Sequence, residues 1–148
     1  MLTQSSGKQL RFVIQEHHAS HLHYDFRLEM LEEGDSENYI LKSWAVPKNI
    51  SDGIGIKRLA IQVEDHDMNY IDFEGIIEEG NYGAGEVIIW DNGSYELISK
   101  KYNDLGELKE IIVMLNGKKI KGEFALIKTR GFGSEKNKEK NWLIFRKK

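Results

Sequence analysis

Hydrophobic and polar residues alternate with a period of two in several short runs along the chain, which is the pattern of half-buried β-strands. The clearest run extends from Leu22 to Met30, with apolar residues on one parity and histidine or charged residues on the other. We predict a strand there. Similar runs, or apolar runs bounded by turn residues, predict further strands at residues 11–16, 39–46, 58–64, 86–90, 94–99, 119–128 and 141–146.

The segments between these runs carry the residues that turns require. A polar stretch at residues 31–38 predicts a hairpin between the two strands that flank it. The sequence Asp91-Asn92-Gly93 is typical of a tight hairpin turn. Four glycines in residues 71–85 match neither the dinucleotide-binding nor the P-loop spacing, so we assign them to backbone turns and close approaches.

One segment departs from the period of two and matches the spacing of a helix face. Asn103 or Asp104 can cap its start, and Asn116-Gly117 can end it. The sequence therefore predicts an α-helix from about Asp104 to Asn116, packed on the sheet. The apolar residues at helical spacing are Leu105, Leu108, Ile111, Ile112 and Leu115. About eight short strands with one flanking helix indicate a mainly β fold, a closed or nearly closed antiparallel β-barrel.

Composition limits the class of protein. A chain of 148 residues suits one domain, residues 1–148, in which the polar residues 1–10 are expected to form a disordered arm. There is no cysteine, which excludes disulfides and thiolate metal sites. No leader and no run of 18 apolar residues occurs, so we expect a soluble, cytoplasmic protein without a membrane partner.

Charge is distributed unevenly along the chain. The net charge is −3, yet residues 118–148 contain eleven Lys or Arg against three Glu. This end therefore carries +8 and the first 117 residues carry −11. A basic flank favours a polyanionic partner, although a lysine-rich end is more often only a solvated surface.

The candidate chemistry gathers at the start of the clearest strand, where four of the five histidines occupy residues 17–23. On the polar face of this strand His23, Asp25 and Arg27 follow one another at a spacing of roughly 6 to 7 Å. Imidazoles with a carboxylate bind first-row divalent metals, and an arginine suits phosphate. The pattern does not decide which two histidines bind. This polar face is expected to line the mouth of the barrel.

Two further candidates lie at strand ends. His66 follows the strand at residues 58–64 and is flanked by acidic residues, so it could ligate a metal, contact phosphate or act as a general acid. Lys48 follows the strand at residues 39–46, where an exposed lysine is usually inert.

Six ordered motifs resemble one known family. They are HHASHLHYDFRLE, LKSWAVPK, VEDHDMNYIDFEG, EGNYGAGEVIIWD, KGEFALIK and NWLIFRK, and the resemblance that they carry runs from about Arg11 to the end of the chain. Together they resemble the 3′-phosphoesterase domain of bacterial non-homologous end-joining DNA ligase D and of its stand-alone archaeal and bacterial relatives.

The resemblance implies a manganese-dependent enzyme that heals 3′ ends, with Zn²⁺ or Co²⁺ as other usable metals. Such enzymes remove a 3′-terminal ribonucleoside from a primer strand, leaving a 3′-phosphate, and then hydrolyse that phosphate to a 3′-hydroxyl. The implied partners are nucleic acid with 3′-phosphate or 3′-ribonucleotide ends, and a ligase and polymerase of end-joining repair at the nucleoid.

The resemblance also implies roles for individual residues. His17, His23 and Asp25 match the family's metal ligands. Arg27 and His66 match its phosphate contacts, and Tyr70 matches its essential tyrosine. Lys48 and Arg58 match basic residues that the family uses chiefly in the phosphomonoesterase step, and Glu64 and Gln15 match supporting residues. The ten residues before Arg11 show no clear match to the N-terminal arm that assists diester cleavage in ligase-linked members, so fewer matching residues support the ribonuclease step than the phosphomonoesterase step.

Two other functions fit parts of the pattern. The His21-x-His23 pair with a nearby carboxylate is also typical of a cupin-like metal-dependent oxygenase or isomerase. A non-catalytic nucleic-acid-binding barrel is the second alternative. Arg27, Lys48, Arg58 and the basic end favour a phosphate substrate over the first, and metal-dependent release of phosphate would exclude the second.

Overall fold

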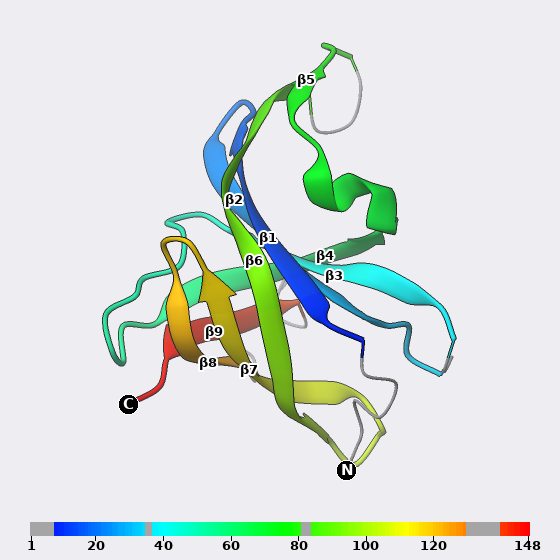
Figure 1. Cartoon of the computed structure of the whole chain (residues 1–148), viewed down its shortest axis with the longest axis vertical. Coiled ribbons are helices and arrows are strands. Elements are labelled where there is room, and N and C mark those ends of the chain that lie inside the picture. The colour runs from blue at the N-terminus through cyan, green and yellow to red at the C-terminus, as the bar shows by residue number, and fades with distance from the viewer. Residues whose placement is uncertain (1–7, 35–36, 81–83, 130–139) are drawn as a thin grey trace.

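The computed structural model describes residues 8–34, 37–80, 84–129 and 140–148, so most of the arm expected at residues 1–10 lies outside the described residues. Nine strands and one short 3₁₀ helix are present there (Figure 1). They are β1 (Leu10–His18), β2 (Leu22–Leu31), β3 (Tyr39–Val46), β4 (Arg58–His66), η2 (Met68–Asp72), β5 (Gly75–Ile77), β6 (Gly85–Tyr102), β7 (Leu108–Gly117), β8 (Lys121–Lys128) and β9 (Asn141–Arg146).

Eight of these strands close into an antiparallel barrel in the order β1-β2-β3-β4-β9-β8-β7-β6, with β6 pairing back to β1. The short strand β5 adds to β6 outside this ring. The predicted barrel is therefore confirmed. Six predicted strands, corresponding to β1, β2, β3, β4, β8 and β9, lie within two residues of the observed bounds at either end.

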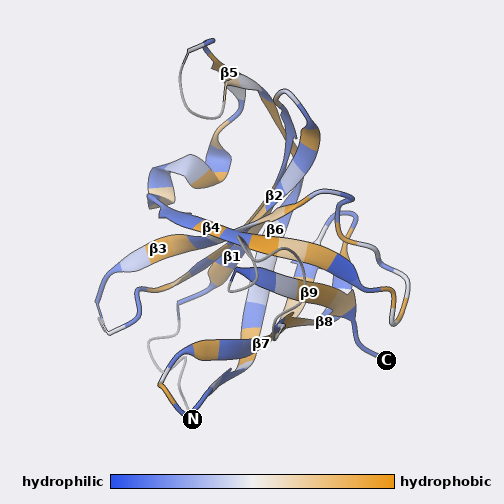
Figure 2. Cartoon of the chain, turned by 180° about the vertical axis from the view of Figure 1, so that it is seen from behind, coloured by the Kyte–Doolittle hydropathy of each residue, from blue (hydrophilic) through white to orange (hydrophobic). Residues whose placement is uncertain are grey.

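The period of two decides which side chains fill the barrel. In β2 the even-numbered Phe26, Leu28 and Met30 are buried in the core, where Trp44 and Trp142 pack edge to face at 5.6 Å between ring centroids. Figure 2 shows hydrophobic and hydrophilic bands following one another along the strands. The odd-numbered residues of β2 therefore lie on the outer surface of the barrel.

Residues 67–80, which follow β4, cover part of that outer surface, and we call them the covering segment. In Figure 1 it leaves β4, forms η2 and returns through β5 to β6. A small second core of Val13, Leu41 and Ile71 holds η2 against β1 and β3. The Asp67 side chain caps η2 by accepting a hydrogen bond from the Asn69 N–H at 2.9 Å. The segment thus creates a covered face on the outside of the barrel.

The helix predicted from Asp104 to Asn116 is wrong, because this region forms strand β7. Ile111, Val113 and Leu115 point into the barrel and are at most 1% exposed. A continuous apolar run fits helical and strand spacing equally well, and pairing with both β6 and β8 decided for the strand. The Asn103 side chain accepts hydrogen bonds from the Leu105 and Glu107 N–H groups, so it caps a tight turn instead of a helix.

The hairpin turn predicted at residues 91–93 is also wrong, because β6 runs unbroken for 18 residues through it. Gly93 is required there for close approach: a Cβ at this position would collide with the backbone oxygen of Asn116 on the neighbouring strand. Asp91 is 3% exposed, and its carboxylate accepts hydrogen bonds from the N–H groups of Lys118, Lys119 and Ile120 at 2.8 to 3.1 Å. Asp91 therefore stabilises the β7–β8 turn.

Among the described residues, no helix has the length and apolar character needed to cross a lipid bilayer.

Asp91→Ala tests the role of this carboxylate. The substitution leaves three N–H groups of the β7–β8 turn without their acceptor, so we expect the free energy of unfolding in urea to fall by about 3 kcal/mol. Asp104→Ala, at an exposed turn position, is the matched control and should change it by less than about 0.5 kcal/mol. Equal effects of the two substitutions would contradict a special role for Asp91.

Candidate functional site

The candidate residues of β1 and β2 lie on the outer face of the barrel and beneath the covering segment, and not at the barrel mouth where we expected them. In the β1–β2 register Gln15 faces Asp25 and His17 faces His23. All four are on the parity opposite to the core residues. The two paired strands therefore bring residues from separate motifs together on one surface.

Three of these residues form a cluster with the chemistry of a metal site. One ligand atom from each of His17, His23 and Asp25 lies within 4.8 Å of the others, and this is the one such group found among the described residues. The Asp25 carboxylate is between the two imidazoles, 3.3 Å from His17 Nδ1 and 3.2 Å from His23 Nε2. The other two histidines that the pattern left open as ligands are outside this cluster. The His18 ring contacts the Glu16 carboxylate at 2.6 Å, and the contact of His21 with the His23 ring is made by the His21 backbone oxygen.

The cluster favours an ionised carboxylate. Burial opposes ionisation of Asp25, but its hydrogen bond with His23 and the charge of Arg27 outweigh burial and lower the pKa of Asp25. Donation of a hydrogen bond to Asp25 in turn raises the pKa of His23, against the effect of burial. Negative charge is thus held at the point where the two imidazoles meet, as cation binding requires.

Arg27 is the residue to which the rest of the site is attached. Arg27 is only 3% exposed, and its guanidinium donates to Gln15 Oε1 at 2.7 Å and to Ser43 Oγ at 2.8 Å. The same group lies 3.5 Å from the Asp25 carboxylate. Acceptors on β1 and β3, together with the Asp25 carboxylate, therefore orient the buried Arg27 side chain and leave it little freedom of movement.

His66 and Tyr70 approach Arg27 from β4 and η2. His66 Nδ1 is 3.2 Å from an Arg27 nitrogen, and the Tyr70 ring stacks on the guanidinium at 4.9 Å. Burial and the charge of Arg27 lower the pKa of His66, and burial raises the pKa of Tyr70. The same Nδ1 lies 3.2 Å from the backbone oxygen of Glu64, so a donor and an acceptor both approach it. The two pKa shifts favour the neutral form of both side chains, and Tyr70 therefore keeps its hydroxyl proton at neutral pH.

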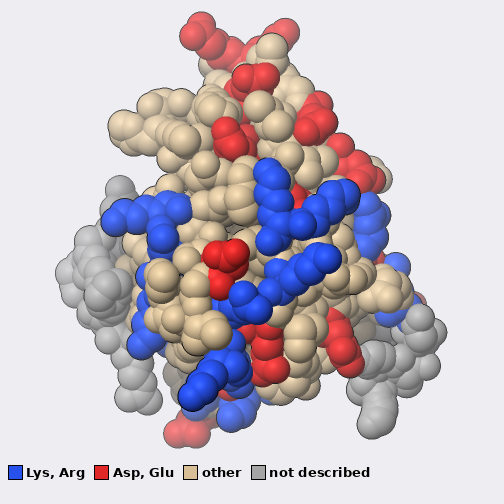
Figure 3. Space-filling model, turned by 60° about the vertical axis from the view of Figure 1, so that its left-hand side comes forward, with Lys and Arg blue, Asp and Glu red and all other residues tan. Residues whose placement is uncertain are grey.

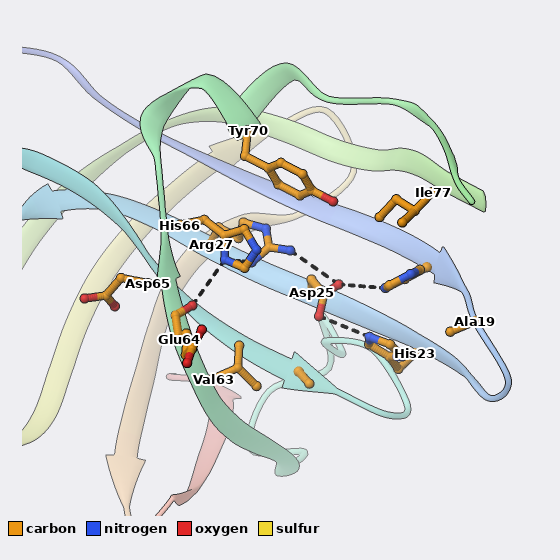
Figure 4. Close-up of a pocket in the computed structure, with 12 residues that line it drawn as sticks. Ala19, His23, Asp25, Arg27, Val63, Glu64, Asp65, His66, Tyr70 and Ile77 are labelled. Atoms are coloured by element: carbon orange, nitrogen blue, oxygen red, sulfur yellow. Dashed lines mark hydrogen bonds and ion pairs between the residues drawn. The ribbon is translucent and has the colours of Figure 1, made fainter. Parts of the chain in front are cut away.

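A cavity of about 450 Å³ lies between the strands and the covering segment. Figure 4 shows Tyr70 and Ile77 on one side of it and His23 and Asp25 on the other, with the Asp65 side chain directed away from them. The predicted site residues that line this cavity are His17, His23, Asp25, Arg27, Glu64, His66 and Tyr70. Seven of the ten predicted residues thus meet around one hollow.

The other three predicted residues lie elsewhere. Gln15 is fully buried behind Arg27 and donates to the backbone oxygens of Tyr70 and Phe73 at 3.0 and 3.3 Å, which ties β1 to the covering segment. Lys48 and Arg58 are not among the residues lining the cavity. They lie side by side, since Arg58 donates to the Lys48 backbone oxygen at 3.2 Å.

Sequence reasoning missed two residues. Ser43 accepts from Arg27, and Phe73 stacks on Tyr70 with ring centroids 4.8 Å apart and an interplanar angle of 15°. Ser43 could have been found as the one small polar residue in an apolar stretch of β3, at a position facing Arg27 in the register. Phe73 carries no such signal, because only the folding of η2 brings it to Tyr70.

A comparison with known families decides the relationship of the chain. The family model described as the DNA ligase D 3′-phosphoesterase domain matches residues 15–128. The chain belongs to this family. The resemblance drawn from the motifs is therefore confirmed, and the match includes every predicted site residue.

Individual relatives agree with the family match. The chain is 49% identical over 126 residues to the multifunctional non-homologous end joining DNA repair protein LigD of Mycobacterium tuberculosis. It is 45% identical over 150 residues to LigD of Mycolicibacterium smegmatis and 43% identical over 139 residues to LigD of Pseudomonas aeruginosa. These matches cover 85%, 97% and 94% of this chain, but only 15%, 18% and 15% of the relatives. The chain thus spans less than a fifth of each of these three proteins.

Gln15→Leu tests how the site is held together. The change removes the acceptor of a buried guanidinium N–H and the donor to two backbone oxygens, so we expect the free energy of unfolding to fall by about 2 to 3 kcal/mol. Gln9→Leu, at an exposed position with one long contact of 3.4 Å, is the control and should have little effect. Urea denaturation followed by tryptophan fluorescence measures both. Equal stability of the two variants would show that Gln15 does not support Arg27.

Proposed function

We propose that this chain of the DNA ligase D 3′-phosphoesterase domain family is a metal-dependent phosphoesterase that heals 3′ ends of nucleic-acid strands. The observation that carries the proposal is the convergence of two imidazoles and one carboxylate beside a buried guanidinium, at one cavity. The first group suits a divalent cation and the second suits a phosphate. The cupin-like alternative is weaker, because His21 lies outside the cluster that its HxH pair would need.

His17, His23 and Asp25 are the proposed ligands, and Mn²⁺ is the proposed metal, with Zn²⁺ or Co²⁺ as substitutes. The donor set fits: two imidazole nitrogens and one carboxylate oxygen are close together, and one side of the group opens to the cavity. When bound, such a cation would supply Lewis-acid stabilisation of the negative charge that develops on the phosphoryl group.

The protein's own side chains have distinct proposed tasks. Arg27 would bind phosphate oxygens and offset their growing charge, since its fixed position requires no rearrangement during the reaction. Tyr70 keeps its hydroxyl proton at neutral pH and is the first proposed donor to the leaving oxygen. His66 is the proposed contact to a phosphate oxygen, because its lowered pKa disfavours the imidazolium form that it would need as the acid. Glu64 would support the site from the cavity wall, and Gln15 from behind Arg27.

The proposed substrates are a strand with one 3′-terminal ribonucleotide, cleaved to a 3′-phosphate, and that 3′-phosphate, hydrolysed to a 3′-hydroxyl. We assign Lys48 and Arg58 to the second reaction, as contacts to the part of the strand that extends beyond the cavity. The relatives are named as proteins of non-homologous end joining, and the Mycobacterium tuberculosis protein as a DNA repair protein. We therefore propose a repair ligase and polymerase as functional partners, acting at the nucleoid.

Metal binding is the first test. His23→Ala and Asp25→Ala each remove one of three proposed ligands, so we expect Mn²⁺ affinity, measured by isothermal titration calorimetry, to fall at least 100-fold. His18→Ala is the matched control, because His18 is exposed and contacts Glu16 instead of the cluster. If the two ligand variants bind Mn²⁺ as the wild-type protein does, this metal assignment fails.

Tyr70→Phe tests the chemistry without disturbing the packing. The ring that stacks on Arg27 and Phe73 is kept and only the hydroxyl is lost, so we expect at least 100-fold slower product formation with an unchanged fold. The assay uses a labelled primer-template ending in one ribonucleotide, with and without Mn²⁺, and follows both the 3′-phosphate strand and its 3′-hydroxyl product.

Tyr102→Phe is the control for this assay, because the Tyr102 hydroxyl donates a hydrogen bond to the exposed Glu33 and neither residue lines the cavity. Wild-type rates for Tyr70→Phe would remove the tyrosine from the mechanism. Absence of either product with wild-type protein and Mn²⁺ would refute the proposed function itself.

A further inference from the structure

A band of cationic side chains crosses the barrel end that is formed by the β3–β4 connection and the β7–β8 turn. We call it the basic band, and it consists of Lys48, Lys57, Arg58, Lys118, Lys119, Lys121 and Arg146. Figure 3 shows Lys and Arg gathered across the middle of this face, whereas Asp and Glu predominate toward its upper end. The uneven charge of the sequence thus has a counterpart on the surface.

Contacts between its members make the band continuous. Arg58 touches Lys48 and follows Lys57 in the chain, and Lys57 lies over the ring of Phe145, the neighbour of Arg146. The Arg146 side chain crosses Gly122, next to Lys121, and so reaches the β7–β8 turn. Seven cations from three separate parts of the chain therefore share one surface.

These cations lack anionic partners within the described residues. None of the seven forms an ion pair with a described carboxylate, whereas Lys100, Lys101 and Lys147 each do. The Lys118 amino group donates to the Asn92 side chain, and Lys119 lies 4.6 Å from the centre of the Trp90 ring. Positive charge that is not neutralised internally is available to an external polyanion.

The band begins close to the cavity. The end of β3 pairs with the start of β2 through Val46 and Tyr24, next to His23. Lys48 follows that end of β3 and Arg58 contacts it. From there the band leads across the barrel end to Lys119, whose partner Trp90 packs edge to face on Tyr24 at 6.3 Å. A strand that ends in the cavity could therefore continue over the band.

We infer that the basic band binds the phosphate backbone of the nucleic acid whose 3′ end occupies the cavity, with Lys118 and Lys119 as its outermost contacts. The inference rests on the proposed function and adds the surface that holds the rest of the substrate. Lysines on flexible stems contact phosphates without reading bases, so binding is independent of sequence and weakens with salt.

The test compares two double charge reversals of equal net charge. Lys118→Glu with Lys119→Glu alters the outer end of the band, whereas Lys101→Glu with Lys109→Glu alters exposed lysines of the β6–β7 region. Binding to a fluorescent primer-template with a 3′-hydroxyl end, which cannot react, is measured by anisotropy at several salt concentrations. We expect at least a 10-fold loss of affinity for the first variant and less than a 2-fold loss for the second.

The salt dependence provides an independent readout. Each lost phosphate contact lowers the slope of log affinity against log salt by about 0.9, so the slope should fall by about 1 to 2 in the first variant. Hydrolysis of a mononucleoside 3′-phosphate, which is too short to extend from the cavity to Lys118 and Lys119 at the outer end of the band, should be unchanged in both variants. Urea denaturation verifies that both remain folded.

Failure of the inference and failure of the proposed function are distinguishable. If Lys118→Glu with Lys119→Glu binds the primer-template with wild-type affinity and slope, the band is not the backbone site, whatever the enzyme hydrolyses. If poly-glutamate binds the wild-type protein as tightly as the primer-template does, the band is a docking surface for acidic protein and the inference is overturned. If the wild-type protein hydrolyses neither substrate, the proposed function fails.

Discussion

The site depends on how one buried arginine is held. Burial of a guanidinium is unfavourable unless its N–H groups are paired. Arg27 is 3% exposed, and its guanidinium donates to Gln15 on β1 and to Ser43 on β3. These bonds join three neighbouring strands on the outer face of the barrel. Because the arginine cannot move without leaving buried donors unpaired, its position relative to Asp25 is determined by the fold.

The covering segment depends on the same arginine. Tyr70 stacks on the guanidinium, Phe73 stacks on Tyr70, and Gln15 donates to the backbone of both aromatic residues. Desolvation by this cover lowers the pKa of His66 and raises that of Tyr70, so it favours the neutral form of both groups. One layer of structure thus shapes the cavity and sets the protonation of its walls.

Charge is separated over the molecule. The site itself holds a carboxylate whose pKa is lowered, beside two imidazoles, an arrangement that suits the cation and the phosphate of the proposed function. The basic band outside the cavity has weaker geometric demands, because its lysines are exposed point charges on flexible stems. This division suits a substrate with one reacting end and a long, uniform polyanionic remainder, as in the function proposed for this domain.

The sequence by itself determined the mainly β barrel and six of the strands, and it predicted the residues proposed for the site, because strand periodicity and ordered motifs are local signals. It misled at residues 104–116 and 91–93, where an apolar run and a turn-like triplet have two local solutions and only pairing with neighbouring strands selects one. The residue pattern left open which histidines meet Asp25; the family resemblance implied His17 and His23, and the folded strands bring these two to it. Tertiary structure alone decided why Ser43 and Phe73 matter, and that the site is outside the barrel. Those facts depend on strand register and on the folding back of a loop, and both are set by contacts between residues far apart in the chain.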